Sequence, residues 1–277
     1  MARVVNLRVM DATALDHAAI AIADVRARRE RLMPLPPALA PVDEAAGYAV
    51  QDRLRLHLAG RGFGAMAGFK IGCTTAVMQT YLGIDHPCAG GISTARIYTD
   101  NPEFAACEFV RPGVECEIAV ELGRDLRPGD APFDRARVGE AVSAVYAAME
   151  IVDDRYDDWR AMPLPTLIAD DFFHAALVLG PRIADWRSLD LARLHGVSRV
   201  NGILVGSGVG ADILGHPLDA LVWLAEHRAR RGLGLTSGDI VSLGSLTETR
   251  WLVEGDEAAI EIESLGAVRI GYGSSTP

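Results

Sequence analysis

The sequence predicts an α+β fold in which a mixed or antiparallel β-sheet body carries helices at its periphery. Helix-like periodicity dominates up to about residue 90, and short strand-like stretches follow one another after it. These stretches do not alternate regularly with helices, which argues against a parallel βαβ arrangement. We therefore expect a helical N-terminal part, residues 1–89, and a β-rich body, residues 90–277, that pack as one compact unit.

Two helices are expected at the start of the chain. Residues 12–32 form an amphipathic pattern whose basic residues gather toward its C-terminal end, which suits the helix dipole. The proline-rich stretch "MPLPPALAP" is expected to end this helix, because proline cannot continue one. Asp43 then occupies the position of an N-cap for a second helix that runs to about Leu58.

The next elements surround a single lysine. Residues 65–72 are short and apolar and predict a strand, residues 74–83 predict a short helix capped by Thr74, and residues 83–92 predict a Gly- and Pro-rich loop. Among 27 Lys and Arg residues, only Lys70 is a lysine. It is either a surface residue left by a bias toward arginine, or an ammonium group kept for proton chemistry that a guanidinium cannot perform.

The β-rich body contains nine strand-like stretches and two helices. The helices are expected at about residues 134–147 and 217–231. The strands are expected at residues 92–100, 107–110, 114–122, 148–154, 176–183, 197–208, 239–246, 258–266 and 267–272. We find neither an internal repeat nor a low-complexity segment, so a single sheet-based core is expected.

Charge and composition argue against several classes of protein. The net charge of −10 and the isoelectric point near 5.2 argue against a nucleic-acid or anionic-membrane partner. No apolar run approaches the roughly 20 residues of a membrane span, and no signal peptide is evident, so we expect a cytoplasmic protein. The four cysteines lack the spacing of a zinc site or a disulfide framework.

Acidic residues mark a candidate metal site. The stretch "VECEIAVEL" alternates strictly, so Glu115 and Glu117 share one face of a strand. This face is either simply wet, or a cation lies between the carboxylates, and hard cations such as Mg²⁺ prefer such oxygen ligands. Glu150, at the end of a second apolar stretch, is a candidate third ligand, in competition with Asp153 and Asp154.

Several motifs, taken in order, resemble a known family. They are "GYAVQ", "GFKIGCTT", "LGIDHP", "VECEIAVELGRDL", "MEIVDDRYDDW", "IADDFFHAALVLG", "VNGILVGSGVGADILGHPLDALVWLAEH" and "SGDIVSLGSLT". In this order and spacing they resemble the 2-keto-4-pentenoate hydratase and 4-oxalocrotonate decarboxylase family of the fumarylacetoacetate hydrolase superfamily. The similarity covers nearly the whole chain.

The resemblance implies a fold and a site. The body would be a mixed β-roll of the fumarylacetoacetate hydrolase C-terminal type, and the protein would be a homo-oligomer. Glu115, Glu117 and Glu150 would hold Mg²⁺ or Mn²⁺, and Lys70 would be the active-site lysine. The expected substrate-binding residues lie in or near the "GCTT", "PCAG", "DFFH" and "GSLT" stretches: Gly72, Cys73, Thr74, Cys88, Phe173, Ser245, Leu246 and Thr247.

The turn after "LGID" differs from the usual family pattern. It reads "PCAG", with Cys88 where an acid is usual. Cys88 is either a small space-filling residue or a nucleophile, and a nucleophile would need a lowered thiol pKa. Asp85 and His86 lie just before it and are candidate replacements for the missing acid or base, on a loop where His86 is otherwise an exposed residue.

Two further stretches also differ. "ADDFFH" places Phe173 and His174 where small hydroxyl residues are usual, which changes the size and polarity of a pocket. His174 is either a structural histidine or a catalytic group. "GSLT" continues with Glu248 and Trp251, where shorter or less charged residues are more familiar.

The predicted activity follows from the resemblance. We expect a divalent-metal-dependent lyase acting on a small anionic 2-oxo or 2-hydroxy-dienoic acid, most simply a hydratase of aromatic-compound catabolism. The carboxylate and the neighbouring oxygen of such an acid can chelate one metal ion. The alternatives are a decarboxylase of a 4-oxalocrotonate-like acid, an acylpyruvate-type C–C hydrolase using a His–Glu pair, and a non-catalytic paralogue that partners a related hydratase or decarboxylase subunit.

Overall fold

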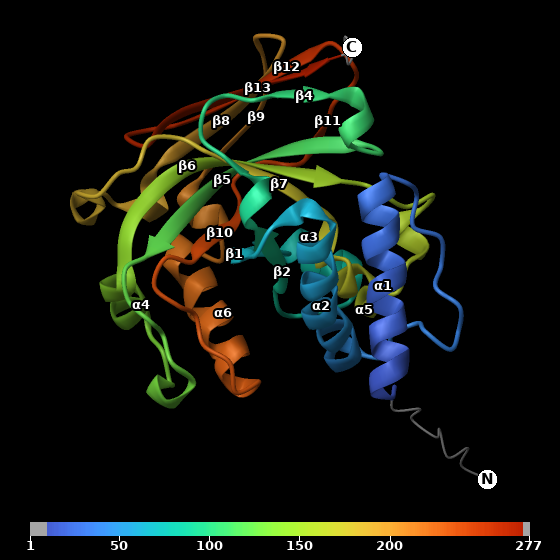
Figure 1. The fold of residues 1–277 in the computed structure, drawn as a ribbon. Coiled ribbons are helices and arrows are strands. Elements are labelled where there is room, and N and C mark those ends of the chain that lie inside the picture. The colour runs from blue at the N-terminus through green and yellow to red at the C-terminus, as the bar shows by residue number, and fades with distance from the viewer. Residues whose placement is uncertain (1–9, 274–277) are drawn as a thin grey trace.

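The computed structural model describes residues 10–273 as two β-sheets above two groups of helices (Figure 1). The predicted α+β fold is confirmed. The first nine and last four residues of the two predicted parts lie outside this range. The α-helices are α1 (Ala12–Arg28), α2 (Glu44–Leu58), α3 (Ala76–Leu82), α4 (Arg135–Ala141), α5 (Leu164–Ala169) and α6 (Pro217–Arg230). None of the helices in residues 10–273 has the length and hydropathy needed to span a membrane.

The larger sheet has eight strands in the order β2-β1-β10-β5-β6-β7-β3, with β11 beside β5. Their bounds are β1 Met66–Gly72, β2 Cys88–Ser93, β3 Ile97–Tyr98, β5 Pro112–Leu122, β6 Val142–Asp153, β7 His174–Leu179, β10 Ile240–Ser245 and β11 Arg250–Trp251. The strand β1 pairs parallel with β10, and the long strands β5 and β6 pair antiparallel along their whole length. The predicted division between residues 89 and 90 falls inside β2, so this sheet holds strands from both parts.

The smaller sheet has five strands in the order β4-β13-β12-β8-β9. Their bounds are β4 Glu103–Ala105, β8 His195–Val200, β9 Ile203–Val209, β12 Asp256–Ile262 and β13 Gly266–Gly273. Figure 1 shows this sheet as a layer across the larger one. The core between the layers includes Ile118 and Val120 of β5 and Ile260 and Ile262 of β12.

The larger sheet curls into a roll. Strand β2, at one end of the sheet order, contacts β7, which lies near the other end. The inner face carries a separate apolar cluster that includes Ile92, Ala119, Ala148 and Leu177. Small side chains such as alanine suit this face, because a tightly curled sheet leaves little room inside it. The inner face is therefore enclosed by the sheet itself.

Two predicted helix boundaries are wrong. Helix α1 ends at Arg28 rather than at residue 32, because Arg29 adopts a left-handed conformation and its amide bonds back to the helix. Helix α3 begins one residue later than predicted, and Thr75 rather than Thr74 caps it, with its hydroxyl 3.4 Å from the amide of Met78.

Other predicted elements are also wrong, and the single strands expected at residues 92–100 and 197–208 are each divided, the first by a 3₁₀ turn at Thr94–Arg96 and the second by the turn between β8 and β9. Residues 142–147 belong to β6 and not to a helix, because pairing with β5 outweighs their alanine content. The predicted loop at 83–92 contains most of strand β2. Its glycines are needed there, since a Cβ at Gly90 would collide with the carbonyl oxygen of Asp171. The predicted strand at 107–110 does not form: residues 107 and 108 belong to a short 3₁₀ turn, Ala106–Glu108, and residues 109 and 110 are in no strand.

A buried network of ion pairs joins α1 to the segment between α5 and β7. Arg26 donates to Asp171 at 2.8 Å and to the carbonyl oxygen of His174 at 3.2 Å. Arg155 donates to Asp170 at 3.0 Å. All four charged side chains are at least nine-tenths buried. Buried ion pairs depend on both partners, because removing one leaves an uncompensated charge in a low dielectric.

We expect Arg26→Met to lower the free energy of unfolding by about 3 kcal/mol, since it leaves Asp171 buried without its cation. Urea unfolding followed by circular dichroism measures this change. Arg28→Met is the matched control on the same helix, because Arg28 is exposed and its one ion pair within residues 10–273 is with the exposed Glu30. Equal effects of the two substitutions would show that the buried network contributes nothing special.

Candidate metal centre

Three carboxylates meet on the inner face of the roll. Glu115 and Glu117 alternate with apolar residues along β5, and the register between β5 and β6 places Glu150 directly opposite Glu115. One carboxylate oxygen from each lies within 4.8 Å of the other two. Glu117 and Glu150 are buried, and Glu115 is partly exposed. The arrangement offers a set of oxygen ligands on one side of a rigid sheet.

Hydroxyl groups from the segment that includes β10 orient two of these carboxylates. The Ser242 hydroxyl donates to Oε2 of Glu117, and the amide of Gly244 lies 3.4 Å from the same oxygen. The Thr249 hydroxyl donates to Oε1 of Glu115. Sequence reasoning missed Ser242 and Thr249. Alternation along "IVSLGS" was a possible signal for Ser242, but no pattern in the sequence pointed to Thr249.

Lys70 and His174 flank the third carboxylate. Lys70 lies within β1, is 3% exposed, and its Nζ is 3.4 Å from Oε1 of Glu150. The Nδ1 atom of His174, at the start of β7, is 2.8 Å from the same oxygen. The Nε2 atom of His174 is buried and has no hydrogen-bond partner among residues 10–273. Glu150 is thus the residue that joins the carboxylates to the two basic groups.

The electrostatics of the cluster follow from this geometry. Burial, followed by repulsion from neighbouring glutamates, raises the pKa of Glu117 well above its usual value and also raises that of Glu115. Burial also disfavours ionised Glu150, but Lys70 and His174 outweigh it and lower the Glu150 pKa. Burial opposes the charged form of Lys70, yet the three carboxylates outweigh it and raise the Lys70 pKa. The three glutamates therefore lie beside one side chain, that of Lys70, which stays positively charged.

The other candidate acids lie elsewhere. Asp153 accepts hydrogen bonds from the amides of Val110 and Arg111, at 3.0 Å and 2.7 Å. Asp154 pairs with the Arg111 side chain at 3.1 Å. Alternation along β6 turns Asp153 to the opposite face from Glu150. The described contacts of both aspartates are structural.

Phe172 rather than Phe173 lies against Lys70. The Lys70 Nζ is 5.5 Å from the centre of the Phe172 ring, whereas Phe173 packs against Tyr156 and Trp159. Asp171, Phe172 and Phe173 all have positive φ angles, of 53°, 50° and 68°. Such a run is costly for residues with side chains and redirects each of them, so alternation could not have predicted which ring reaches Lys70.

The predicted "GCTT" and "PCAG" residues form the wall beside Lys70. A Cβ at Gly72 would lie 3.4 Å from Lys70 Nζ and 3.2 Å from the Phe172 ring, so only glycine fits comfortably. The thiols of Cys73 and Cys88 contact each other, and this contact, followed by burial, raises the Cys88 pKa. A neutral, buried thiol favours the space-filling interpretation of Cys88 over the nucleophilic one.

The "GCTT" stretch and the "GSLT" stretch pack against one another. Gly244 has a φ of 119°, and a Cβ there would lie 2.5 Å from the Thr74 hydroxyl. The Ser245 hydroxyl donates to the carbonyl oxygen of Thr247 at 2.6 Å, and the Thr247 hydroxyl lies 3.4 Å from the Cys116 amide. Leu246 is buried in the core. These contacts fix the loop that follows β10 against β5.

Asp85 and His86 are not brought to the carboxylates by any described contact. The Nε2 atom of His86 lies 3.4 Å from Glu44 at the start of α2, and its Nδ1 atom lies 2.9 Å from the carbonyl oxygen of Pro87. Asp85 is exposed. Their predicted catalytic roles gain no support from this placement.

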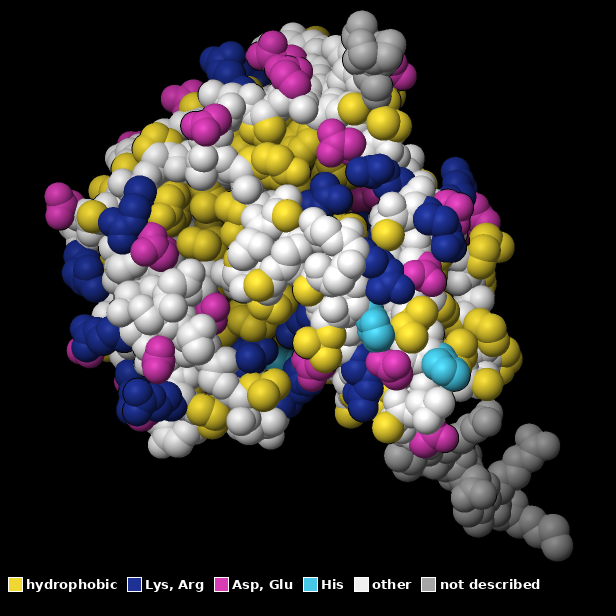
Figure 2. Space-filling model, viewed as in Figure 1, with side chains coloured by type: hydrophobic (Ala, Val, Ile, Leu, Met, Phe, Trp, Pro, Cys, Tyr) yellow, Lys and Arg dark blue, Asp and Glu magenta, His cyan; other side chains and the backbone are white. Residues whose placement is uncertain are grey.

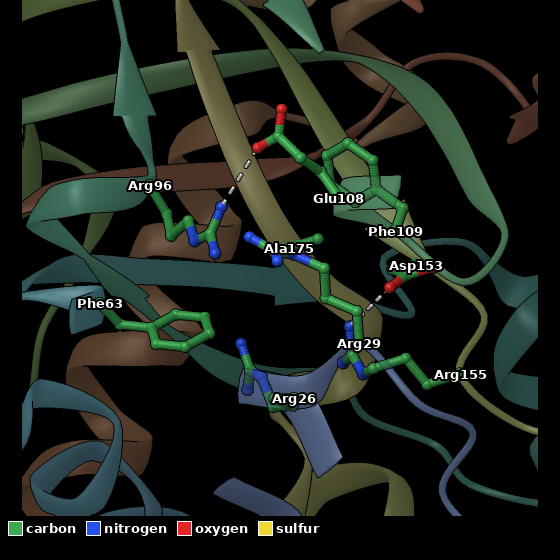
Figure 3. Close-up of a pocket in the computed structure, with 9 residues that line it drawn as sticks. All are labelled: Arg26, Arg29, Phe63, Arg96, Glu108, Phe109, Asp153, Arg155 and Ala175. Carbon is green, nitrogen blue, oxygen red and sulfur yellow. Dashed lines mark ion pairs between the residues drawn. The ribbon is translucent and has the colours of Figure 1, made fainter. Parts of the chain in front are cut away.

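A small pocket lies behind the strand that carries His174. Figure 3 shows four arginines around it, together with Phe63, Phe109 and two acids. Arg26 and Arg155 reach from it to the carbonyl oxygen of His174, at 3.2 Å and 3.4 Å. Their charges are balanced by Asp170 and Asp171. The arginines that line this pocket therefore support the segment that positions His174 and Phe172.

Known proteins share both the sequence and the fold. Residues 98–271 match the model of the fumarylacetoacetate (FAA) hydrolase C-terminal family. The chain is 31% identical over 262 residues to a 2-keto-4-pentenoate hydratase of Paraburkholderia phymatum, covering 95% of this chain and 98% of that one. It is 28% identical over 228 residues to a 4-oxalocrotonate decarboxylase of Pseudomonas putida, covering 81% and 83% of the two chains.

A solved structure shows the same fold. The 4-oxalocrotonate decarboxylase from Pseudomonas putida G7, complexed with magnesium and adipate, matches with a TM-score of 0.89 and 24% identity, over 96% of this chain and 99% of that one. The sequence motifs predicted this relationship. The chain belongs to the 2-keto-4-pentenoate hydratase and 4-oxalocrotonate decarboxylase family, within the fumarylacetoacetate hydrolase superfamily.

Proposed function

We propose that this protein is a lyase that depends on Mg²⁺ or Mn²⁺ and hydrates a 2-oxo or 2-hydroxy-dienoic acid in aromatic-compound catabolism. The observation that carries the proposal is the buried group Glu115, Glu117 and Glu150 with Lys70 beside it. The proposal includes a cytoplasmic location, a homo-oligomeric state, and the capacity to associate with a paralogous hydratase or decarboxylase subunit.

The residues present fit a hard divalent cation. Three carboxylates against one ammonium leave an excess of negative charge in a low dielectric, which a divalent ion would balance. All three ligands are oxygens, as Mg²⁺ and Mn²⁺ prefer. When bound, the ion would act as a Lewis acid that stabilises negative charge on the chelating oxygens of the substrate.

The protein side chains supply the proton chemistry. Lys70 is held by Glu150 under the Phe172 ring, where it can pair with the substrate carboxylate or deliver a proton from Nζ. His174 binds Glu150 through Nδ1, which leaves Nε2 as the atom able to hold a water molecule or accept its proton. Phe172 excludes bulk water from the Lys70 side of the site.

Sequence identity to known relatives favours hydration over decarboxylation as the activity of this chain. Several curated hydratases are 31–35% identical to this chain, whereas the decarboxylase is 28% identical. Decarboxylation is the second candidate, because that relative belongs to the same family and both reactions need stabilised negative charge on the same chelating oxygens. The His174–Glu150 pair keeps C–C hydrolysis of an acylpyruvate as a third activity to assay.

We expect Glu117→Gln to weaken Mg²⁺ and Mn²⁺ binding by more than about 100-fold, because losing even an outer hydrogen-bond partner of a metal ligand costs about 10–100-fold. Isothermal titration calorimetry measures the affinity, and circular dichroism checks the fold. Glu121→Gln is the matched control, since Glu121 lies on the same face of β5 but pairs with Arg182 at 2.8 Å. Unchanged affinity in Glu117→Gln would remove the metal site from the proposal.

We expect Lys70→Arg to retain metal binding and to lower kcat by about 10²–10⁴-fold, because a guanidinium keeps the charge but does not exchange its proton near neutral pH. Lys70→Ala is expected to abolish turnover with the fold intact. Steady-state kinetics with a 2-hydroxydienoate measures both. Wild-type kcat in Lys70→Arg would restrict Lys70 to an electrostatic role.

A direct assay distinguishes the candidate reactions. The purified protein with Mg²⁺ or Mn²⁺ is expected to hydrate 2-hydroxypenta-2,4-dienoate faster than it decarboxylates 4-oxalocrotonate or cleaves an acylpyruvate, with activity lost on chelation and restored by metal. Faster decarboxylation or cleavage would select that activity instead. Absence of all three, together with absence of metal binding, would support a non-catalytic partner subunit.

A further inference from the structure

A second charged site lies between α2 and α6, on the outer side of β1. Phe69 alternates with Lys70 along β1, so its ring points away from the interior of the roll. The Arg55 guanidinium of α2 lies 5.2 Å from the centre of this ring, and that of Arg228 of α6 lies 4.1 Å from it. We call the region between α2 and α6 that holds Arg55, Arg228 and Arg231 the arginine notch.

The space-filling view shows this region as a hollow. Figure 2 shows Lys and Arg side chains gathered where α6 and α2 approach each other at the lower edge of the molecule. The two helices form its walls, and the Phe69 ring is buried against Arg55 and Arg228. Arg231 bridges the walls, because it reaches from the end of α6 to Asp52 of α2 at 2.5 Å. The notch is therefore held by both helices, and its three arginines are partly buried.

Positive charge in the arginine notch exceeds its negative partners. Asp52 is shared by Arg55, at 3.3 Å, and Arg231. Arg228 makes no ion pair with any described residue, and its Nε donates to the carbonyl oxygen of Gly234 at 2.6 Å. Two guanidinium groups thus share one carboxylate, and the third has no ion-pair partner among the described residues, so positive charge is in excess here in a protein of net charge −10.

Other acids near the notch have partners of their own. Asp239 acts on Arg228 through space, but its carboxylate accepts from the Thr236 amide at 2.8 Å. Asp171 acts on Arg55 in the same way but pairs with Arg26 at 2.8 Å. Asp171 is therefore neutralised by Arg26, whereas Asp239 offsets part of the charge of Arg228 without forming an ion pair with it.

Keeping these partly buried arginines charged costs free energy. Burial, followed by repulsion from Arg55, lowers the pKa of Arg228 to about 10, and burial also lowers the pKa of Arg55. Burial and the neighbouring arginines lower the pKa of His227 to about 4, so this residue is neutral and adds no charge near pH 7. Contact with the Phe69 ring offsets part of the cost through cation–π attraction.

We propose that the arginine notch binds a small oxyanion carrying about two negative charges, with inorganic phosphate as the simplest example. The guanidinium groups of Arg228 and Arg231 present planar forks that match two oxygens of such an anion. An anion of this kind would balance the excess positive charge. The site is separate from the metal centre, because Phe69 and Lys70 point to opposite faces of β1.

Isothermal titration of sodium phosphate into the full-length, Mg²⁺-loaded protein tests the proposal at constant ionic strength. We expect saturable binding at one site per chain, weakened about tenfold or more in Arg228→Gln and in Arg231→Gln, because each loses a charge-assisted hydrogen bond. Arg230→Gln is the matched control, since Arg230 is exposed at the same helix end and its loss changes the net charge equally.

A substitution that is expected to strengthen phosphate binding distinguishes a binding role of the arginines from a packing role. Asp52→Asn removes the carboxylate that competes for Arg55 and Arg231, so phosphate should bind more tightly than in the wild type. A parallel titration with AMP distinguishes free phosphate from the phosphoryl group of a nucleotide, and either source supports an oxyanion site. Absence of saturable binding, or equal binding in Arg228→Gln and Arg230→Gln, would overturn the proposal and leave the arginines as packing around Phe69.

Discussion

Like-charge repulsion among Glu115, Glu117 and Glu150 is the constraint on which the rest of the site depends. The register of β5 and β6 forces these carboxylates together on the inner face of the roll, where the burial of Glu117 and Glu150 limits screening by water. The surrounding groups all reduce this repulsion. Lys70 supplies a charge, hydroxyl groups donate to two of the glutamates, and a bound cation would balance the remainder.

A strained segment completes the site. Asp171, Phe172 and Phe173 hold left-handed backbone conformations that persist only where the surroundings fix them. Asp171 is fixed through Arg26 and through the amide of Gly91, at 2.8 Å and 2.7 Å. The buried ion pairs behind β7 thus set the positions of the Phe172 ring and of His174, although they do not contact the carboxylates themselves.

The two arginine-rich regions of the protein differ in charge balance. Behind β7, Arg26 and Arg155 have Asp170 and Asp171 as partners, so that pocket is a structural support. Between α2 and α6, Arg55 and Arg231 share Asp52 and Arg228 has no ion-pair partner among the described residues, so the arginine notch has unused capacity for an anion. Charge balance, rather than the number of arginines, distinguishes a support from a binding site.

The sequence alone determined the fold class, the family and the acidic face of β5, because hydrophobic periodicity and motif order are properties of neighbouring residues. Only the tertiary structure decided that Glu150 rather than Asp153 joins Glu115, that Phe172 rather than Phe173 reaches Lys70, and that residues 142–147 form a strand. These outcomes depend on strand register and on backbone strain imposed by distant parts of the chain, which no local pattern records.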